Sequence, residues 1–589
     1  MKILGIFDDH NAGCALIQDG KIIAAVEEER LSRIKLHNGT VDGLPIDSLK
    51  MVLDIGHTRP EEIDRIALAM MPPAQLQRIV LRDLFTKQKN WRWILASLFS
   101  KSIRWDRYWL FYPYFYNRNR IAKVKKMLKS VGLGDKPIDL VDHHRSHAAA
   151  AYFTSGRTRA LIVTLDGQGD GHCGQVWLGE DGRLRQLEAV SSYHSPGLFY
   201  NFITWYLGYK PMRHEGKITG LAAHGSFQRV RHLFEPLFAL ENGEFRYKLA
   251  ERHFQHAYPH RSNYVKFKRS LPEEFHQLSP QDVAAGVQVL TEKVVAGYVD
   301  RFLQKTGPID VCMAGGIFAN VRINQKVAEL PNAKSVFIFP AMGDNGLPAG
   351  AALYSYYQNM GWPKIEEMPQ LQDVYLGPGY SDEEIESALK KSNLQYERID
   401  NMAKKVAELL HAGHVVARFD GRMEYGPRAL GNRSILYQPA DKTVNDWLNH
   451  KLNRTEFMPF APVTLLDAMD GNYQRIEANI YPARFMTITF DCSDEMEKKC
   501  PSVVHVDKTA RPQLIDRESN PVYYDILMEF KKLSGLNSII NTSFNMHEEP
   551  IVCTPADAIR AFELGHLEYL SIGNFLVYSP DPEKAKQRQ

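Results

Sequence analysis

The chain has 589 residues, of which 44% are hydrophobic and 24% charged, the composition of a folded protein with about two to four domains of roughly 150 residues each. Lysine and arginine number 72 against 69 aspartates and glutamates, so no global positive field predicts nucleic-acid binding. Six widely spaced cysteines without a CxxC pair argue against a disulfide framework or thiolate zinc site and favour a cytoplasmic protein. We expect neither a leader peptide nor an apolar run of the roughly 18 residues that a membrane span needs.

Two stretches of the chain repeat one order of predicted strands and turns. In the first, strands at residues 2–7, 14–18 and 21–26 are joined by DDHNAG and then by a DG turn; ALIVTLDG, GQVWLGE and RLRQLEAV repeat this order about 155 residues later. Halves that each open with such a hairpin resemble the actin-like, sugar-kinase-like ATPase fold, whose two turns face each other across a nucleotide cleft. We therefore predict an α/β protein with a duplicated, actin-like N-terminal domain.

Residues 76–120 interleave tryptophan, tyrosine and phenylalanine with arginine and lysine. Charges interrupt the apolar residues too often for a bilayer span, but an amphipathic helix through residues 91–116 would give weak contact with a membrane or an apolar acceptor. The alternative is a helical insertion packed on its own domain, because aromatic residues at helical spacing usually belong to a core. Residues 226–280 show no clear period and give no prediction.

A metal site is predicted from His143 and His147, which stand four residues apart ahead of an alanine run. In a helix both imidazoles lie on one face. Two apolar strands end at Asp166 and Asp344, and together the four side chains form a donor set suited to Fe(II), Mn(II) or Zn(II) with positions open to substrate. The alternative is that the paired histidines cap a helix or face solvent.

A nucleotide site is predicted from glycine-rich turns. Residues 213–217 place charges among small residues, as a phosphate site requires. Gly315 and Gly316 lie between a predicted strand and helix, with Asn320 after them. This order is typical of a shelf for the base and ribose, because glycines let a planar ring lie on the backbone.

A domain boundary is predicted near residues 360–379, where three prolines interrupt the pattern. It divides the chain into residues 1–362 and 370–580. The second domain has its own predicted helices and strands, so it is also α/β.

The segment GRMEYGPRALGNRSIL carries Arg422, Arg428 and Arg433 among glycines. Three guanidiniums in one turn repel each other unless an anion lies between them, and their planar donors fit phosphate or carboxylate. The alternative is an arginine face exposed to solvent.

Further polar residues of the second domain extend this predicted anion site. Lys451, Arg454, Arg484 and Arg511 add positive charge ahead of strand-like segments, and Asn541 opens a run of short polar side chains that can hydrogen-bond a nucleotide phosphate or ribose.

Nine ordered blocks now define a resemblance that runs along nearly the whole chain: DDHNAGCALIQDGKIIAAVEEERLSRIK, DHHRSHAAAAY, LDGQGDG, EGKITGLA, MAGGIFANVRIN, MGDNG, GRMEYGPRALGNRSIL, EFMPFAPV and NTSFNMHEEPIV. They resemble the O-carbamoyltransferase family, which includes nodulation-factor and antibiotic carbamoyltransferases. The resemblance implies an N-terminal domain like the catalytic subunit of tRNA threonylcarbamoyltransferases and a C-terminal domain like the YrdC domains that make carbamoyl adenylates.

The resemblance also implies a reaction. The C-terminal domain condenses carbamoyl phosphate with ATP, held with Mg²⁺, to carbamoyl adenylate, and the hydroxyl of a small-molecule acceptor attacks this intermediate in the metal-containing domain. An imidazole acting as general base typically contributes roughly 10² to 10⁴ in rate. A labile activated intermediate also requires an enclosed transfer route.

By matching motifs, the resemblance implies roles for particular residues. It places iron at His143, His147, Asp166 and Asp344, the general base at His10, and Lys35 near the transferred group. It places carbamoyl phosphate and ATP against Arg422, Arg428, Lys451, Arg454, Arg511 and Asn541. Met458 stands where some family members have an arginine, next to the assignments of Lys451 and Arg454.

Two other functions stay open. A small-molecule kinase of the actin-like fold would need neither His143 nor His147, and would transfer phosphate to its acceptor. A non-enzymatic nucleotide-binding protein would bind a partner without turnover. The identities of the acceptor and the metal are not determined by the sequence, and a homodimer is the default assembly because two-fold dimers are the commonest.

Overall fold

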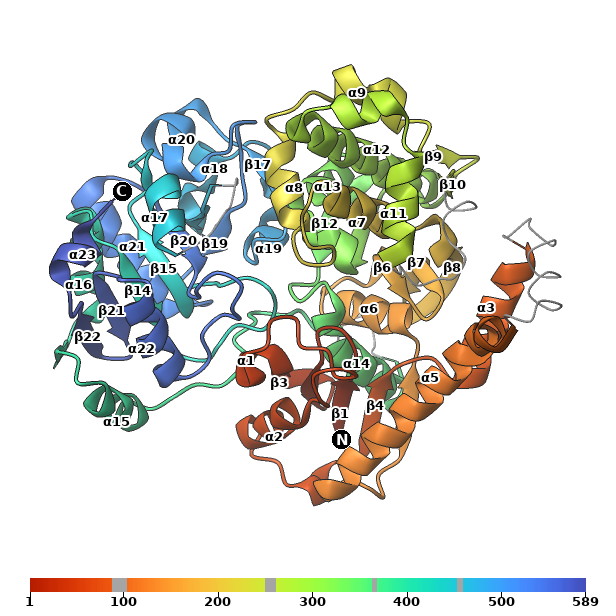
Figure 1. Cartoon of the computed structure of the whole chain (residues 1–589). Helices are drawn as coiled ribbons and strands as arrows, with labels where there is room; N and C mark the ends of the chain where they lie inside the picture. Colours follow the sequence, from red (N-terminus) through yellow and green to blue (C-terminus); the bar gives the residue numbers. More distant parts are fainter. Residues whose placement is uncertain (87–102, 249–260, 363–367, 453–458, 589) are drawn as a thin grey trace.

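The computed structural model describes residues 1–86, 103–248, 261–362, 368–452 and 459–588, with side chains placed except at 84–86, 103–112 and 261–263. Within these residues the strands form two five-stranded sheets, one eight-stranded sheet and two two-stranded ribbons. Helices pack around the sheets (Figure 1), so the predicted α/β fold class is confirmed.

The two five-stranded sheets have the same topology. The first has the order β3-β2-β1-β4-β5 and the second β8-β7-β6-β11-β12. In each, the first three strands form an antiparallel meander, and the first strand pairs in parallel with the fourth, which pairs in parallel with the fifth. The predicted duplication is therefore confirmed. The strands are β1 (Lys2–Phe7), β2 (Gly13–Gln18), β3 (Lys21–Glu27), β4 (Arg65–Ala69), β5 (Ile138–Val141), β6 (Arg159–Gly169), β7 (His172–Glu180), β8 (Arg183–Ser191), β11 (Ile309–Ala314) and β12 (Ala333–Ile338).

Helices α6 (His143–Tyr152) and α14 (Leu347–Met360) follow the fifth strand of each sheet and pack against each other. The alanine run at residues 148–151 is completely buried. A Cβ on Gly350 of α14 would lie 1.9 Å from the carbonyl oxygen of Ser146, so only glycine permits this approach. The N-terminus of α6 is capped by Asp142, whose side chain accepts from the N–H of Arg145.

The two duplicated sheets of the N-terminal half differ in the connection between their fourth and fifth strands. In the first sheet this connection contains α3 (Pro73–Thr86) and α5 (Ile103–Ser130). In the second sheet it contains the short turn η4 (Gly316–Ala319) and α13 (Val321–Ala328). The predicted segment 91–116 lies partly outside the described residues and otherwise within α5. Among the described residues, no helix has both the length and the apolarity needed to cross a membrane.

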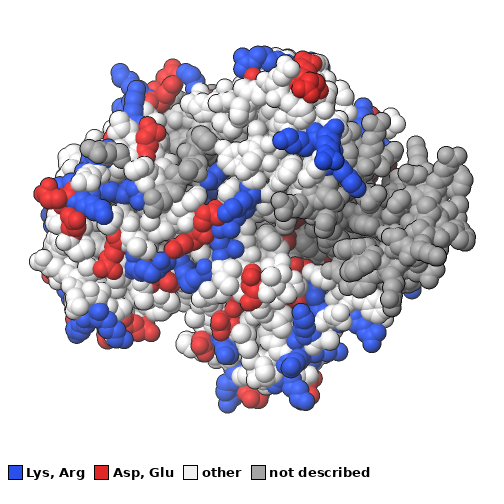
Figure 2. Space-filling view, viewed as in Figure 1, with Lys and Arg blue, Asp and Glu red and all other residues white. Residues whose placement is uncertain are grey.

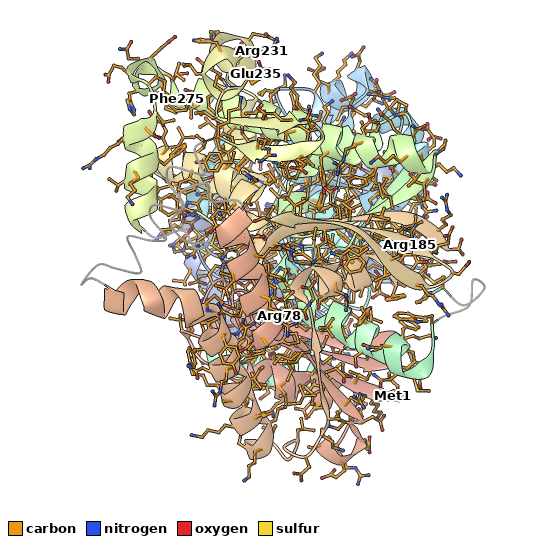
Figure 3. All side chains as sticks on the ribbon, turned by 90° about the vertical axis from the view of Figure 1, so that its right-hand side faces the viewer. Met1, Arg78, Arg185, Arg231, Glu235 and Phe275 are labelled. Carbon is orange, nitrogen blue, oxygen red and sulfur yellow. The ribbon has the colours of Figure 1, made fainter. Side chains whose placement is uncertain are left out.

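Other elements complete the N-terminal half. Among the described residues, the longest helix of the second duplicated unit is α12 (Pro280–Thr306), which begins at a serine cap followed by proline. At the end of α9 (Phe227–Phe234), Arg231 Nε lies 2.8 Å from Glu235 Oε1 in an ion pair on the outside of the protein (Figure 3). The further elements are α1 (Glu28–Ser32), α2 (Ile46–Ile55), α7 (Pro196–Tyr206), α8 (Glu215–Ala222), α9 (Phe227–Phe234), β9 (Phe238–Glu241), β10 (Glu244–Tyr247) and α11 (Arg261–Ser270).

The C-terminal half is built on the eight-stranded mixed sheet, in the order β13-β22-β21-β14-β15-β20-β16-β19. The predicted division of the chain at residues 362 and 370 stays a prediction. The strands are β13 (Tyr396–Arg398), β14 (Val416–Phe419), β15 (Arg433–Tyr437), β16 (Ala461–Leu465), β19 (Gln513–Ile515), β20 (Ser538–Ser543), β21 (Tyr569–Ile572) and β22 (Phe575–Tyr578), and the longer helices are α15 (Asp382–Ser392), α16 (Met402–His411), α17 (Val444–Lys451), α20 (Asp494–Lys499), α21 (Pro521–Ser534) and α22 (Pro555–Leu564).

Charged contacts join the two halves. Arg33 donates to the carbonyl oxygens of Pro550 and Ile551, both at 2.8 Å. Glu548 accepts from Lys210 at 2.9 Å and from His214 at 2.8 Å, and Arg213 also lies against it. Elsewhere basic and acidic side chains are interspersed over the visible face (Figure 2), in keeping with the net charge of +3.

We expect Glu548→Gln to destabilise the protein at neutral pH and to destabilise it less in acid. Burial alone would raise the pKa of Glu548, but hydrogen bonds from His214 and Lys210 lower it from 4.5 to about 2. Because the folded pKa is the lower one, the carboxylate contributes its stability above pH 4.5 and loses it as the pH falls toward 2. Solvent screening limits the effect to about 1 kcal/mol. Thermal unfolding at neutral pH and near pH 3 tests this; the exposed Glu495→Gln is the control, and an equal difference from wild type at both pH values would contradict it.

Candidate active site

Four side chains from three elements meet between the two N-terminal sheets. His143 and His147 lie one turn apart on α6, Asp166 lies in β6, and Asp344 lies at the turn before α14. The Nε2 atom of His147 is 3.3 Å from Asp166 Oδ2 and 3.6 Å from Asp344 Oδ1. The Nε2 atom of His143 is 3.5 Å from Asp344 Oδ1 and 3.8 Å from Asp166 Oδ2. The four residues predicted to converge do so, with one donor atom from each within 4.8 Å of the others.

The group has the donor chemistry of a divalent-metal site. The Nε2 atoms of His143 and His147 and the Oδ1 atom of Asp344 are buried without a hydrogen-bond partner among the described residues. Such atoms are costly unless something binds them. Asp166 is held in place by the N–H groups of Gly167 at 2.6 Å and Gly316 at 3.1 Å. Two imidazoles and two carboxylates fit Fe(II), Mn(II) or Zn(II).

The metal group places two carboxylates close together. Burial and the neighbouring Asp166 carboxylate raise the pKa of Asp344 well above its usual range. Burial alone would also raise the pKa of Asp166, but the neighbouring imidazoles of His143 and His147 hold it well below its usual range. A bound divalent cation would offset the repulsion between the two carboxylates.

His144, between the two clustered histidines, is not part of the group. Its Nδ1 contacts Thr164 Oγ1 at 3.0 Å and its Nε2 contacts the carbonyl oxygen of His172 at 3.1 Å. Its imidazole is therefore a core residue with both ring nitrogens in hydrogen-bond contact.

Gly315 and Gly316 position a carboxylate of the metal group, and their predicted role as a nucleotide shelf stays a prediction. Gly315 has φ 106°, and a Cβ there would lie 2.1 Å from the carbonyl oxygen of Leu165. This close approach brings the N–H of Gly316 to Asp166. Asn320 caps α13 and donates from Nδ2 to Gln288 Oε1 at 2.8 Å.

His10 and Lys35 lie on neighbouring loops at the end of the first sheet. The N–H of His10 donates to Asp9 Oδ1 at 3.0 Å, and Lys35 Nζ donates to Glu29 Oε1 at 3.2 Å. Burial lowers the pKa of His10 although Asp9 opposes this, so its ring is neutral at neutral pH and able to accept a proton. Burial likewise lowers the pKa of Lys35 against the effect of Glu29.

The α5 helix of the insertion is bonded to the loop that carries His10. Arg120 lies 2.6 Å from Asp8 and 3.2 Å from Asp9, and Tyr116 Oη donates to Asp9 at 2.7 Å. Sequence reasoning missed this cluster. The sequence did contain a signal for it. Asp8 and Asp9 directly follow a buried strand, and two adjacent carboxylates at such a position need a cation from elsewhere in the chain.

One cavity of about 960 Å³ connects these features. Its lining includes His10, Lys35 and members of the metal group. It also includes Gly316 and Asn320 and, from the C-terminal half, Arg428. Where it passes α3 its wall is apolar, with Leu76, Val80 and Leu81, and α5 adds Pro113 and the polar side chains of Tyr116, Asn117 and Arg120. A cavity of this size is large enough for a nucleotide and a second ligand.

Arg428 is presented by a loop folded around a buried carboxylate. Glu424 Oε1 accepts from the N–H groups of Leu430 at 2.8 Å, Asn432 at 2.8 Å and Arg433 at 3.2 Å. The side chain between these anchors, Arg428, reaches the carbonyl oxygen of Ala319 in the N-terminal half at 3.4 Å.

The other two arginines of this loop bind backbone instead of facing the cavity. Arg422 donates to the carbonyl oxygens of Ile23, Leu376 and Gly377 at 2.7 to 3.0 Å. Arg433 is buried and donates to four carbonyl oxygens of the surrounding turns. The carbonyl oxygens of these glycine-rich turns accept hydrogen bonds from the two guanidiniums, where the sequence analysis expected an anion to do so. The anion-binding role of Arg422 therefore has no support in its contacts and stays a prediction.

The remaining predicted residues are dispersed. Lys451 donates to the carbonyl oxygen of Ala585 and lines neither this cavity nor the smaller one described below. Asn541 is buried and donates to Ala429 and Gln513, behind the Arg428 loop. Arg454 lies outside the described residues, as does Met458.

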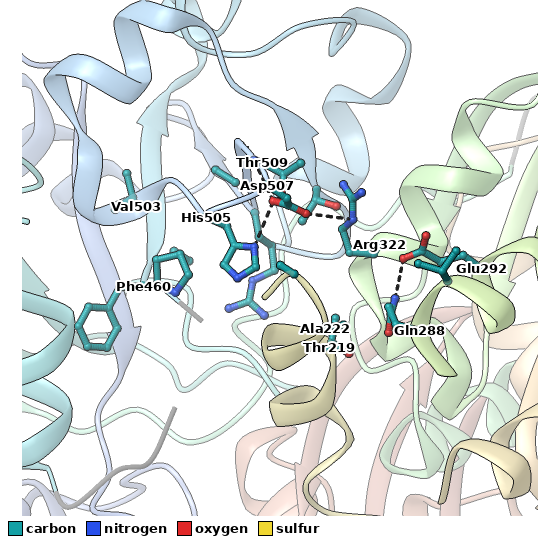
Figure 4. A pocket seen from close by; sticks show the side chains of 17 residues that line it. Thr219, Ala222, Gln288, Glu292, Arg322, Phe460, Val503, His505, Asp507 and Thr509 are labelled. Atoms are coloured by element: carbon teal, nitrogen blue, oxygen red, sulfur yellow. Dashed lines mark hydrogen bonds and ion pairs between the residues drawn. The ribbon is translucent and has the colours of Figure 1, made fainter. Parts of the chain in front are cut away.

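Arg511 lines a second cavity, of about 120 Å³, where the two halves meet (Figure 4). Burial and the neighbouring Arg428 guanidinium hold the pKa of Arg511 well below its usual range. No carboxylate of the described residues forms an ion pair with it. Thr219 lines both cavities, so they adjoin.

Comparison with known families covers most of the chain. The model Carbamoyltransferase N-terminus matches residues 2–353, and Carbamoyltransferase C-terminus matches residues 407–579. These matches define a transferase with two family domains. The chain belongs to the carbamoyltransferase family.

Individual relatives agree. Over 98% of this chain and 97% of its own length, Uncharacterized protein sll1178 of Synechocystis is 32% identical. Nodulation protein NolNO of Sinorhizobium fredii is also 32% identical, over 96% of this chain and 79% of its own length. Among solved structures, HypF of T. kodakarensis is 13% identical with a TM-score of 0.34, over 62% of this chain and 49% of its own.

We expect His147→Ala to abolish binding of one divalent metal ion per chain, because the variant lacks a donor of the buried group. His144→Asn is the matched control: it removes a neighbouring imidazole of the same helix and costs about 1 to 3 kcal/mol of stability without changing metal content. Metal analysis of both purified variants and calorimetric titration with Mn²⁺ test this. Equal metal content in the two variants would contradict it.

Proposed function

We propose that the protein is an O-carbamoyltransferase that forms carbamoyl adenylate from ATP and carbamoyl phosphate and transfers the carbamoyl group to the hydroxyl of a small-molecule acceptor. Membership of the family supports carbamoyl transfer. The observation that carries the finer proposal is the shared cavity, which is lined by Arg428 of the C-terminal half and by His10 and the metal group of the N-terminal half.

In the first stage, carbamoyl phosphate, ATP and water give carbamoyl adenylate, phosphate and pyrophosphate. Arg428 and Arg511 would hold the phosphate groups, since planar guanidiniums suit bidentate phosphate contacts. The buried, ion-pair-free setting of Arg511 supports this assignment, because a bound anion would offset the cost of its burial. ATP would enter with Mg²⁺.

In the second stage, the acceptor hydroxyl oxygen forms a bond to the carbamoyl carbon and AMP leaves. His10 would take the hydroxyl proton, and Lys35 lies in the same cavity where it would bind near the transferred group. His143, His147, Asp166 and Asp344 would hold a divalent metal, iron by resemblance, which supplies a positive charge for an oxygen anion when bound. The apolar side chains of α3 line the same cavity as His10 and would limit the access of water to the intermediate.

Arg428→Ala and His10→Ala separate the two stages. We expect Arg428→Ala to lose carbamoyl-phosphate-dependent pyrophosphate formation, because it removes a phosphate contact, while His10→Ala keeps it. We expect the histidine variant to lose transfer to an acceptor by about 10² to 10⁴. Pyrophosphate and carbamoyl adenylate are measured with ATP, carbamoyl phosphate and Mg²⁺ and without acceptor.

The control is Arg517→Ala, an exposed arginine of the same half paired with Asp525. Formation of ADP with phosphate transfer to an acceptor would replace the proposal with the kinase. Nucleotide binding without any product would replace it with the binding protein.

A further inference from the structure

A buried ion pair of the N-terminal half holds the loop between β14 and β15 (residues 420–432), which we call the arginine loop. Glu27 ends β3 and Arg30 lies in α1, and the two residues are only 3% and 2% exposed. Arg30 Nε lies 3.5 Å from Glu27 Oε2. Glu27 Oε1 accepts from the N–H of Gly426 at 2.8 Å, and Arg30 Nη2 donates to the carbonyl oxygen of Gly426 at 2.8 Å. Both backbone polar groups of one residue are therefore paired with side chains of the other half.

The residue that is held lies two positions before Arg428. The φ of Gly426 is 119°, a conformation that residues with a side chain rarely adopt. Pro427 follows, and its ring fixes the backbone φ between the glycine and the arginine. After Arg428 the arginine loop is anchored from within by Glu424. The ion pair of the N-terminal half therefore supplies the anchor on the other side of Arg428.

Arg30 also connects this contact to Lys35. The Nη1 atom of Arg30 lies 3.5 Å from Glu29 Oε1, the oxygen to which Lys35 Nζ donates at 3.2 Å. The other oxygen of Glu29 accepts from the N–H of Leu36 at 2.7 Å. Because Arg30 and Lys35 share one carboxylate, a displacement of the guanidinium changes the environment of the Lys35 side chain.

Glu27 connects the same contact to the metal group. Its Oε1 atom also accepts from Asn345 Nδ2 at 3.1 Å, and Asn345 directly follows Asp344. Tyr425 of the arginine loop donates from Oη to the carbonyl oxygen of Asn345. The arginine loop and the turn that carries Asp344 are therefore bonded to each other and to Glu27.

Stability alone is a poor explanation for this arrangement, because a buried ion pair is often no more stabilising than apolar side chains of similar volume. What the two charged side chains add is direction, since an acceptor and a donor together fit one backbone residue in one orientation. We propose that Glu27 and Arg30 are positioning residues that fix Arg428 in the shared cavity, in one arrangement with Lys35 and the metal group. The proposal rests on the proposed function for the role that Arg428 has there.

The first test is hydrogen–deuterium exchange at the Gly426 amide of the full chain, without substrates. The double variant Glu27→Gln/Arg30→Met removes both charges, so that neither is left buried and unpaired. We expect exchange at this amide to become about ten-fold faster, because its charged acceptor is lost, while the rest of the chain exchanges as in the wild type.

Arg33→Met is the matched control for exchange. Arg33 also joins the two halves, but it donates to carbonyl oxygens outside the arginine loop, so its loss should leave the Gly426 amide unchanged. Unchanged exchange at Gly426 in the double variant overturns the proposal, and so does an equal acceleration throughout the chain.

The second test is carbamoyl-phosphate-dependent pyrophosphate formation. We expect the double variant to lower kcat/KM about ten- to hundred-fold, the usual effect of losing one hydrogen bond to a charged group. Arg30→Lys keeps the charge without the planar fork and should recover part of the activity. In the background Arg428→Lys the double variant should cost less than in the wild type, because the side chain that it positions is already altered. Equal losses in the two backgrounds overturn the positioning role.

The two tests fail in different ways. Faster exchange at Gly426 with wild-type pyrophosphate formation shows that the contact does not position Arg428, and it overturns the proposal. Faster exchange in the variant of a protein that forms no pyrophosphate at all rejects the proposed reaction instead, and keeps the ion pair as the anchor of the arginine loop.

Discussion

The close contact of α6 with α14 is the constraint on which the N-terminal half depends. Each helix follows the last strand of one duplicated sheet, and the pair touches through small residues, with Gly350 against the backbone at Ser146. His143 and His147 project from one helix, and Asp344 precedes the other. A bulkier residue at the contact would separate the imidazoles from the carboxylate, so the packing of alanine and glycine sets the metal-group geometry.

Charged groups fall into two classes in this protein. Glu424, Arg422 and Arg433 bond mainly to backbone groups, and they shape the loop that presents Arg428. The metal group and Arg511 are buried with atoms that lack partners among the described residues. A charge bonded to backbone stabilises one conformation, whereas an unpartnered buried charge costs free energy that a bound ligand would offset.

The sequence predicted the duplication and the metal group because both depend on local signals: strand–turn order, helical spacing of histidines, and aspartates at strand ends. It could not separate Arg428 from Arg422, because that difference depends on carbonyls from Ile23 and other distant residues. The pairing of Asp8 and Asp9 with Arg120 was missed for the same reason, because Arg120 belongs to a helix far along the chain. Contacts between elements that are far apart in the chain produce no periodic pattern in the sequence.

The unequal connections between the fourth and fifth strands of the two sheets have a mechanical consequence. In one copy of the duplicated unit the connection is a short turn and helix, and in the other it contains α3 and α5 beside His10. Because Arg120 and Tyr116 bond α5 to Asp8 and Asp9, a shift of this helix is transmitted to the loop that carries His10. The longer connection is therefore coupled to one wall of the cavity, whereas the shorter one holds only the turn beside Asp166.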